Sequence, residues 1–231
     1  MNAQGWFPTL ICDFESQTHE QFKDIFYNNL SKYVHPEGID GEHADVSFHH
    51  NTEFDFFFKE ITAFAQQYLA EMAVDPDEYD IHLVKCWWQS LSKNHIPMHN
   101  HSDAHLSFVY YANVPPESAH LHFQADPQTF SNDLTKGLFL DDYNGKFPIK
   151  NYNIYNAMSV AYEAKEAKVI VFPATVNHMT TASNDKDDVT SDIDIIKKRR
   201  ISISGDFIIT FKNTRNVAMG LQPVKNWRNF G

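Results

Sequence analysis

The chain has 231 residues, of which 42% are hydrophobic and 14% aromatic, which predicts one domain with a sizeable core. Its formal net charge of −11 disfavours binding to a nucleic-acid backbone, which needs clustered Lys and Arg. The two cysteines are too few for a disulfide framework, and no stretch approaches the ~20 apolar residues of a membrane span. We therefore expect a soluble protein of the reducing cytoplasm that binds neither nucleic acid nor membrane.

Two amphipathic helices are predicted in the first third of the chain. Apolar residues recur at helical spacing within 18–34 and again within 51–74, where each set forms one stripe. Asn51 or Thr52 is suited to cap the second helix, because short polar side chains accept hydrogen bonds from free N–H groups. This region, about 17–75, is expected to support a β-rich core.

Short β-rich runs follow from about residue 82. They read "HLVKCWWQSL", "LSFVYYANV", "AHLHFQA", "MSVAYEA", "KVIVFPA" and "ISISGDFIIT". Helices followed by a series of strands are typical of a mainly β fold with flanking helices (α+β), here a jelly roll, rather than of alternating βαβ units. We predict one domain over 1–231 with its β core at about 82–211.

Two long connections interrupt the predicted strands, at 127–157 and 181–197. Connections of this length in a compact domain are usually lids or disordered segments. The second is rich in aspartate but lacks the glycine and the terminal glutamate of a calcium loop, which favours a solvated acidic loop.

Candidate metal ligands gather in "PMHNHSDAHLSFVYY", residues 97–111. His99, His101 and Asp103 alternate, so their side chains project to one side of an extended segment. Imidazole and carboxylate groups from this segment, completed by a distant histidine, suit an iron site that keeps three positions open. His178, which follows the run "KVIVFPATVN" and is the last histidine, is the candidate for the distant ligand.

The first prediction for the metal ligands is His101, Asp103 and His178, because a carboxylate offsets part of the iron charge. His99 is the alternative ligand. One argument opposes Asp103, since only three residues separate it from Ser107, which is a short path if the two positions lie on different sheets.

A second constellation suits the carboxylate of a keto acid. In "RRISISGDFII", Arg200, Ser202 and Ser204 share one face of a predicted strand, and Arg199 is expected to point away into solvent. Arginine is a planar two-pronged donor for carboxylates. Ser107 and Tyr111 share the parity of His101 and are expected to reach the same carboxylate.

The order His-x-Asp, distant His and Arg-x-Ser resembles the 2-oxoglutarate/Fe(II)-dependent oxygenase superfamily. The blocks "FPT", "WWQSLSKNHIPMHNHSDAHLSFVYYANVP", "HLHFQADP", "VIVFPATVNH" and "RRISIS" resemble a family of small oxygenases related to prolyl hydroxylases and found in marine bacteria and phages. The resemblance covers most of residues 6–210.

This resemblance implies a double-stranded β-helix (cupin-like jelly roll) that holds Fe(II) through the histidine loop and His178. It also implies 2-oxoglutarate anchored by Arg200, Ser202 and Tyr111, with molecular oxygen as co-substrate. The implied activity is hydroxylation of an unactivated C–H bond in an amino acid, a peptide or a small metabolite. Because such relatives commonly carry His-x-His followed by a non-acidic residue, the pairs His99/His101 and His101/Asp103 both stay open.

Two other classes of function remain as alternatives. The first is a cupin-like metalloenzyme with a three-histidine site, His99, His101 and His178, that uses no keto acid; it leaves Arg200 unexplained. The second is a non-catalytic β-sandwich that binds a ligand or partner and whose histidines are structural.

Overall fold

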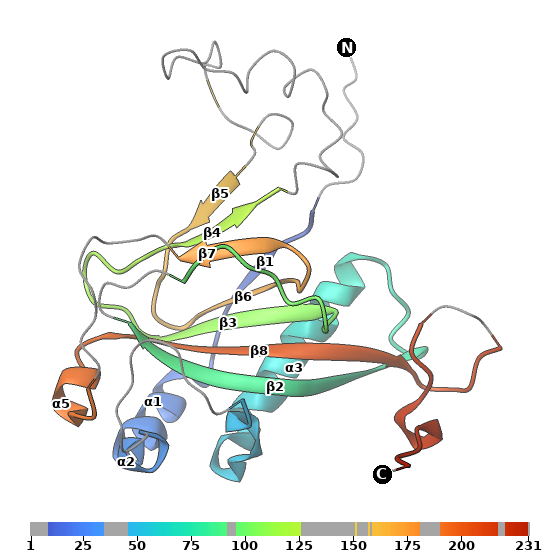
Figure 1. Cartoon of the computed structure of the whole chain (residues 1–231), viewed down its shortest axis with the longest axis horizontal. Helices are drawn as coiled ribbons and strands as arrows, with labels where there is room; N and C mark the ends of the chain where they lie inside the picture. Colours follow the sequence, from blue (N-terminus) through green and yellow to red (C-terminus); the bar gives the residue numbers. More distant parts are fainter. Residues whose placement is uncertain are drawn as a thin grey trace.

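The structure of the chain is a computed structural model that describes residues 9–34, 46–91, 96–125, 151, 157, 159–180, 190–216 and 220–230. Two antiparallel sheets form its centre, with helices against the larger sheet (Figure 1). The helices are α1 (His19–Asn28), α2 (Leu30–Tyr33), α3 (Asp55–Glu71) and α5 (Ile193–Ile196), with 3-10 helices at Phe48–His50, Thr52–Phe54 and Val224–Asn226. The strands are β1 (Cys12–Glu15), β2 (Tyr79–Leu91), β3 (Leu106–Asn113), β4 (Leu121–Gln124), β5 (Ser159–Tyr162), β6 (Lys168–Pro173), β7 (Asn177–Thr180) and β8 (Arg200–Phe211).

The structure confirms the predicted helical segments and all six predicted β-rich runs, while β1 and β7 have no counterpart among the predicted strands. The predicted cap of the second helix is wrong. A 3-10 turn precedes α3, Phe54 occupies the N-cap position, and no side chain caps the helix. The Asn51 side chain instead donates a hydrogen bond to the carbonyl of Phe48, 2.8 Å away.

The strand order is β1-β6-β3-β8-β2 in the larger sheet and β5-β4-β7 in the smaller one. Most neighbours in these sheets are distant in the sequence, as in a jelly roll, which confirms the predicted fold class. The longest ladder joins β2 to β8, from Tyr79 opposite Phe211 to Leu91 opposite Arg200.

Alternation along β8 separates two environments. Arg200, Ser202 and Ser204 line a cavity that also takes residues from the smaller sheet, whereas Ile201 and Ile203 belong to the main core. The other strands of the larger sheet contribute further side chains to the cavity: Trp87, Gln89, Ser107, Val109 and Tyr111.

Helices cover the opposite face of the larger sheet (Figure 1). The rings of Phe26 on α1 and Trp88 on β2 lie 5.3 Å apart between centroids, and those of Phe57 on α3 and Tyr110 on β3 lie 4.7 Å apart. Burial of such rings contributes strongly to stability. The helices therefore support the sheet from one side and leave its other face to the cavity.

The segment 96–101 extends the smaller sheet beside β7. His99 and His178 exchange both backbone hydrogen bonds, at 3.0 and 2.9 Å. The N–H of Thr180 donates to the carbonyl of Ile96 at 3.2 Å, and the N–H of Ile96 donates to the hydroxyl of Thr180 at 2.6 Å. A turn at Ser102 and Asp103 then carries the chain over to β3 in the larger sheet. The histidine segment thus joins the two sheets.

The two predicted lids lie mostly outside the described residues, which leave out 126–150, 152–156, 158 and 181–189. The end of the second connection is described and contains α5. Asp192 caps this helix by accepting hydrogen bonds from the backbone N–H groups of Asp194 and Ile195, at 2.9 and 3.3 Å. Both aspartates are exposed, in agreement with the predicted solvated acidic segment.

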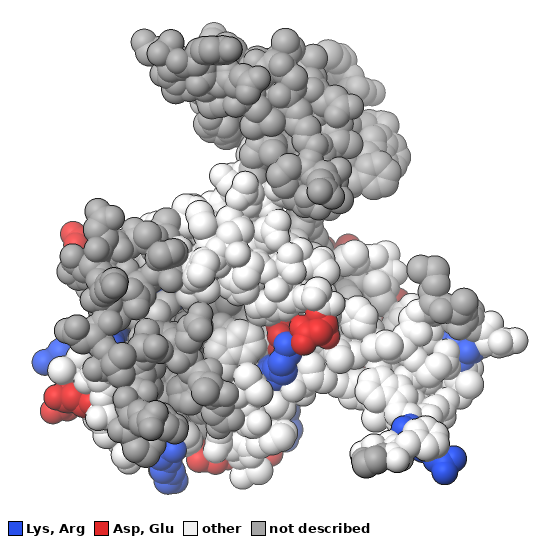
Figure 2. All heavy atoms as spheres, viewed as in Figure 1, with Lys and Arg blue, Asp and Glu red and all other residues white. Residues whose placement is uncertain are grey.

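On the face shown in Figure 2, the described Lys and Arg side chains lie singly or beside acidic ones and form no continuous basic patch. None of the helices in the described ranges combines the length and the apolar character that crossing a membrane requires.

Candidate metal and co-substrate site

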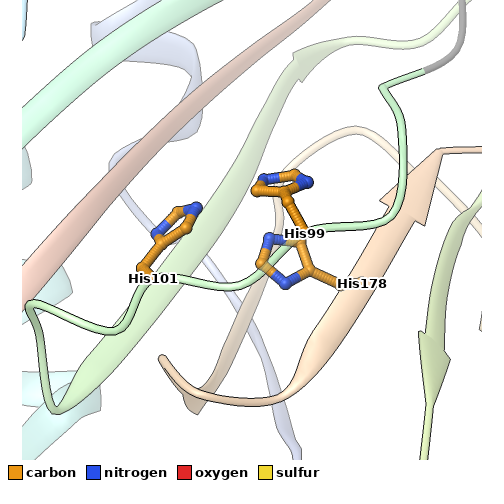
Figure 3. A group of neighbouring side chains, drawn as sticks. All are labelled: His99, His101 and His178. Atoms are coloured by element: carbon orange, nitrogen blue, oxygen red, sulfur yellow. The ribbon is translucent and has the colours of Figure 1, made fainter.

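Three histidines from two segments converge at the cavity. His99 and His101 come from the segment that pairs with β7, and His178 comes from β7 itself (Figure 3). One ring nitrogen from each lies within 4.8 Å of the other two, close enough for a single ion to bind all three. Among the residues that the structure describes, this is the one group of His, Cys, Asp or Glu side chains with such spacing.

The hydrogen bonds of the three rings favour metal binding. Nδ1 of His99 lies 2.8 Å from the carbonyl oxygen of Pro97, and Nδ1 of His178 lies 2.9 Å from that of Val176. A carbonyl oxygen only accepts, so each Nδ1 carries the proton and donates it. The lone pair on Nε2 of both rings is then available for a metal.

His101 also forms a hydrogen bond through Nδ1, but its partner is a carboxylate rather than a backbone carbonyl. Its Nδ1 lies 2.7 Å from Oδ1 of Asp206, a residue with 0% exposure. An ionised carboxylate only accepts hydrogen bonds, so Nδ1 of His101 donates to it, and in the neutral ring the lone pair on Nε2 is available for a metal. Histidine ligands of metals usually donate their second N–H in this way.

Burial keeps His178 neutral. Desolvation lowers its pKa to about 4, with the neighbouring His99 and His101 acting in the same direction against the hydrogen bond to Val176. A histidine must be neutral to bind a metal, and His178 fulfils this condition throughout the physiological pH range.

The structure does not bring Asp103 into the histidine group. Its side chain is 67% exposed and pairs with Lys85, at 2.7 Å between Oδ2 and Nζ. The physical reason is the turn between the sheets, because alternation of side chains ends where the extended segment ends. His99, the alternative ligand in the sequence-based prediction, takes the place in the group that Asp103 was expected to fill.

Sequence reasoning missed Asp206 and Lys85. Asp206 also accepts a hydrogen bond from Ser107 Oγ at 2.6 Å and lies 3.2 Å from Lys85 Nζ. A signal was present, since Asp206 continues the parity of Arg200, Ser202 and Ser204 along β8.

The residues predicted to bind the keto acid line the same cavity as the three histidines. Arg200 is 3% exposed and lies over the ring of Tyr111, with 5.6 Å from the guanidinium carbon to the ring centroid. Ser202 lies beside Arg200 on β8 and is 1% exposed. Burial raises the pKa of Tyr111, against the opposing charge of Arg200, so its phenol stays protonated and can donate a hydrogen bond. Ser107 also lines the cavity, although its hydroxyl is engaged by Asp206.

The expectation that Arg199 is solvated is wrong, because this residue is only 7% exposed. Arg199 lies in a bend just before β8, where the alternation of a strand does not apply. Asn113 donates a hydrogen bond to the carbonyl of Arg199 at 2.7 Å and so ties the start of β8 to the end of β3.

Comparisons with solved structures give the fold. The non-heme alpha ketoglutarate dependent epimerase SnoN from nogalamycin biosynthesis is similar to this chain with a TM-score of 0.50 and 11% identity, covering 91% of this chain and 81% of SnoN. A Pseudomonas putida prolyl-4-hydroxylase has a TM-score of 0.47 and 11% identity, covering 87% of this chain and 92% of its own. A 2OG-Fe(II) oxygenase family oxidoreductase from Burkholderia pseudomallei has a TM-score of 0.36 and 13% identity, covering 62% of this chain; the chain spans half (50%) of that protein.

No curated protein sequence matches the chain. A family model described as "Putative 2OG-Fe(II) oxygenase" matches residues 85–191. This range contains all three histidines of the candidate metal site, whose free Nε2 atoms suit Fe(II), while Arg200 follows it on β8. Residues 85–191, a little under half of the chain, therefore resemble the 2OG-Fe(II) oxygenases, a family that uses Fe(II) and 2-oxoglutarate as cofactors.

Proposed function

We propose that the chain is a 2-oxoglutarate- and Fe(II)-dependent dioxygenase that hydroxylates an unactivated C–H bond of an amino acid, a peptide or a small metabolite. One observation carries the proposal: three histidines suited to a metal and an arginine suited to a carboxylate line a single cavity. When bound, iron and 2-oxoglutarate together supply the activation of oxygen, while the protein supplies binding, orientation and a dry environment.

In this proposal His99, His101 and His178 are the metal ligands. Three neutral imidazoles leave three positions of an octahedral ion open for 2-oxoglutarate and oxygen. The ring orientations are fixed before the metal arrives, because every Nδ1 is already held by a hydrogen bond.

Arg200, Ser202 and Tyr111 form the proposed site for the far carboxylate of 2-oxoglutarate. A buried guanidinium binds a carboxylate strongly because no water competes for either charge. The hydroxyl groups of Ser202 and Tyr111 are suited to complete the hydrogen bonds of the same carboxylate.

The rest of the cavity suits an uncharged part of the substrate. Its further lining is largely apolar, with Gln89, Ser107, Thr180 and Ser204 as polar exceptions; the apolar residues are Trp87, Ile96, Phe108, Val109, Leu121, Phe172 and Met179. Such a wall favours a C–H bond over a charged group.

The test is substrate-stimulated turnover of 2-oxoglutarate. Purified protein is supplied with Fe(II), 2-oxoglutarate and oxygen, and succinate is measured with and without a panel of amino acids and peptides. We expect succinate formation that increases with the true substrate and is lost in His178→Ala. Failure of the iron-loaded protein to bind 2-oxoglutarate would contradict the proposal.

A cupin-like three-histidine metalloenzyme that uses no keto acid is the second candidate. The observation in its favour is that the described metal group contains three imidazoles and no carboxylate. Metal-dependent oxidation of a substrate in the absence of 2-oxoglutarate would support it, and it would leave the buried Arg200 without a role. A cytoplasmic location and the absence of nucleic-acid partners stay predictions.

A further inference from the structure

Asp206 is the one buried acidic residue among those that the structure describes, with 0% exposure. A buried carboxylate is strongly unfavourable unless hydrogen bonds and charges compensate it. Asp206 lies on β8 and contacts His101, one of the candidate metal ligands, so its negative charge lies close to the candidate metal site.

Two hydrogen-bond donors and one cation surround the carboxylate of Asp206, which is the environment that a buried ionised carboxylate requires. Oδ1 accepts from His101 Nδ1 at 2.7 Å and from Ser107 Oγ at 2.6 Å, while Oδ2 lies 3.2 Å from Lys85 Nζ.

Lys85 does not neutralise the group. Its ammonium also pairs with Asp103, at 2.7 Å, so one cation is shared between two carboxylates. With His101 neutral, Asp103, Lys85 and Asp206 together carry one negative charge. Asp206, the innermost of these three residues, is hydrogen-bonded to the imidazole of His101, which is a candidate metal ligand.

His101 differs in this respect from the other two ligands. His99 and His178 donate Nδ1–H to backbone carbonyls, whereas His101 donates to a charged carboxylate. A carboxylate partner raises the basicity of an imidazole and fixes its orientation more strongly than a neutral acceptor does.

We propose that Asp206 is a positioning residue that acts through His101 and supplies to the metal site the negative charge that its three neutral ligands lack. The inference rests on the proposed function only in assuming that the three histidines bind Fe(II). The total charge supports it. Fe(II) and Arg200 bring three positive charges, and 2-oxoglutarate and Asp206 bring three negative charges.

The first test measures metal affinity rather than turnover. Co(II) is titrated into the metal-free protein under anaerobic conditions, and its visible absorption reports the ligand field. Asp206→Asn keeps the shape and an acceptor oxygen but removes the charge. We expect its Kd for Co(II) to rise ~10–100-fold, with a shifted absorption band. The control Asp13→Asn removes an exposed carboxylate that pairs with Lys168 at 3.3 Å in the same sheet, and it should leave both readouts unchanged.

Lys85→Met should change the Kd for Co(II) in the opposite direction to Asp206→Asn. This variant therefore separates an effect of the Asp206 charge from a purely structural effect. Removal of the lysine leaves the Asp206 charge uncompensated in the metal-free protein, so metal binding relieves more unfavourable charge. Co(II) should bind several-fold more tightly, although the ion pairs are lost. This variant also decides the question if Asp206→Asn fails to fold.

Two results would overturn the inference. The first is Co(II) binding by Asp206→Asn with the affinity and spectrum of the unaltered protein, and the second is binding by Lys85→Met that is no tighter. Neither result touches the proposed function. That proposal fails instead if the unaltered protein and His178→Ala bind Co(II) equally weakly.

Discussion

His99 and His178 lie directly opposite each other and exchange both backbone hydrogen bonds, at 3.0 and 2.9 Å. Their ring centroids are 4.3 Å apart as a direct result. The distance between two candidate ligands is therefore fixed by strand register, and a slip of one residue would turn one of the rings to the other side of the sheet.

The structure places His99, and not Asp103, beside His101 and His178, which favours His99 as the third ligand. His99→Ala should weaken metal binding by more than the ~10–100-fold that follows loss of a ligand's outer partner. Asp103→Ala removes an exposed carboxylate at 2.7 Å from Lys85 and should retain most of the metal affinity. Anaerobic Fe(II) titration of both variants tests this. Loss of metal in Asp103→Ala, with retention in His99→Ala, would favour a carboxylate ligand.

Arg200→Ala should lose 2-oxoglutarate binding and keep iron. The far carboxylate of the keto acid would then be buried without its cation, a loss of ~2–5 kcal/mol in binding free energy. Calorimetric titration of 2-oxoglutarate into the metal-loaded protein measures this loss. Arg199→Lys is the matched control, because Arg199 is also buried, at 7% exposure, but is not among the residues that line the cavity. The opposite outcome would show that the register of β8 is wrong.

Gly205 allows β8 to lie close to β2 and β3. An added Cβ would lie 2.6 Å from Cε1 of Phe108 and 2.7 Å from the backbone oxygen of Lys85. We expect Gly205→Ala to lower the free energy of unfolding by ~1–3 kcal/mol, as measured by urea denaturation. Adding Phe108→Leu should recover part of the loss, since the contact with the backbone oxygen remains. An unchanged stability would contradict the close approach of the strands.

His19 should make stability depend on pH. Burial lowers its pKa below the ordinary value of 6.5, with Lys23 acting in the same direction and Glu20 and Glu166 opposing. The folded state therefore binds this proton more weakly than the unfolded state does. The stabilisation is complete above pH 6.5 and is lost as the pH falls through the folded-state pKa.

His19→Gln removes this titration. Between about pH 7.5 and pH 5.5, the free energy of unfolding of the metal-free variant should fall less than that of the unaltered protein. The difference amounts to ~1.4 kcal/mol for each tenfold change in proton affinity. The variant also loses the 2.7 Å contact of His19 with the Tyr110 hydroxyl, which lowers stability at both pH values, so the slope is the informative quantity. Parallel pH profiles would show that His19 does not titrate on unfolding.

Periodicity predicted the parts of the site that lie within regular strands. Arg200, Ser202 and Tyr111 line the cavity because strand parity holds from end to end in β8 and over this part of β3. The role of Asp103 was not predictable in this way, since alternation says nothing about where a chain leaves one sheet for another. The preference for His99 arises from a backbone pairing with a residue 79 positions later, which no local pattern contains.

Other features could not be predicted from the sequence because they are short or depend on contacts between distant segments. β1 has four residues, "CDFE", two of them acidic, and its strand character comes from pairing with β6. Arg199 is buried although it lies in the bend before β8, where strand alternation gives no prediction of burial. Asp206 follows a glycine that breaks the run of side chains, so it stood apart from Arg200 and the two serines although it shares their face.

The histidine segment has a consequence for the cohesion of the fold. Each strand of the smaller sheet has only four residues, so this layer should open more readily than the ladder of β2 and β8. His99 and His178 belong to the smaller sheet, while His101 is hydrogen-bonded through Asp206 to the larger one. An ion held by all three would act as a cross-link between the layers, and amide exchange in β4 and β7 would slow in proportion to the fraction of protein that carries the metal.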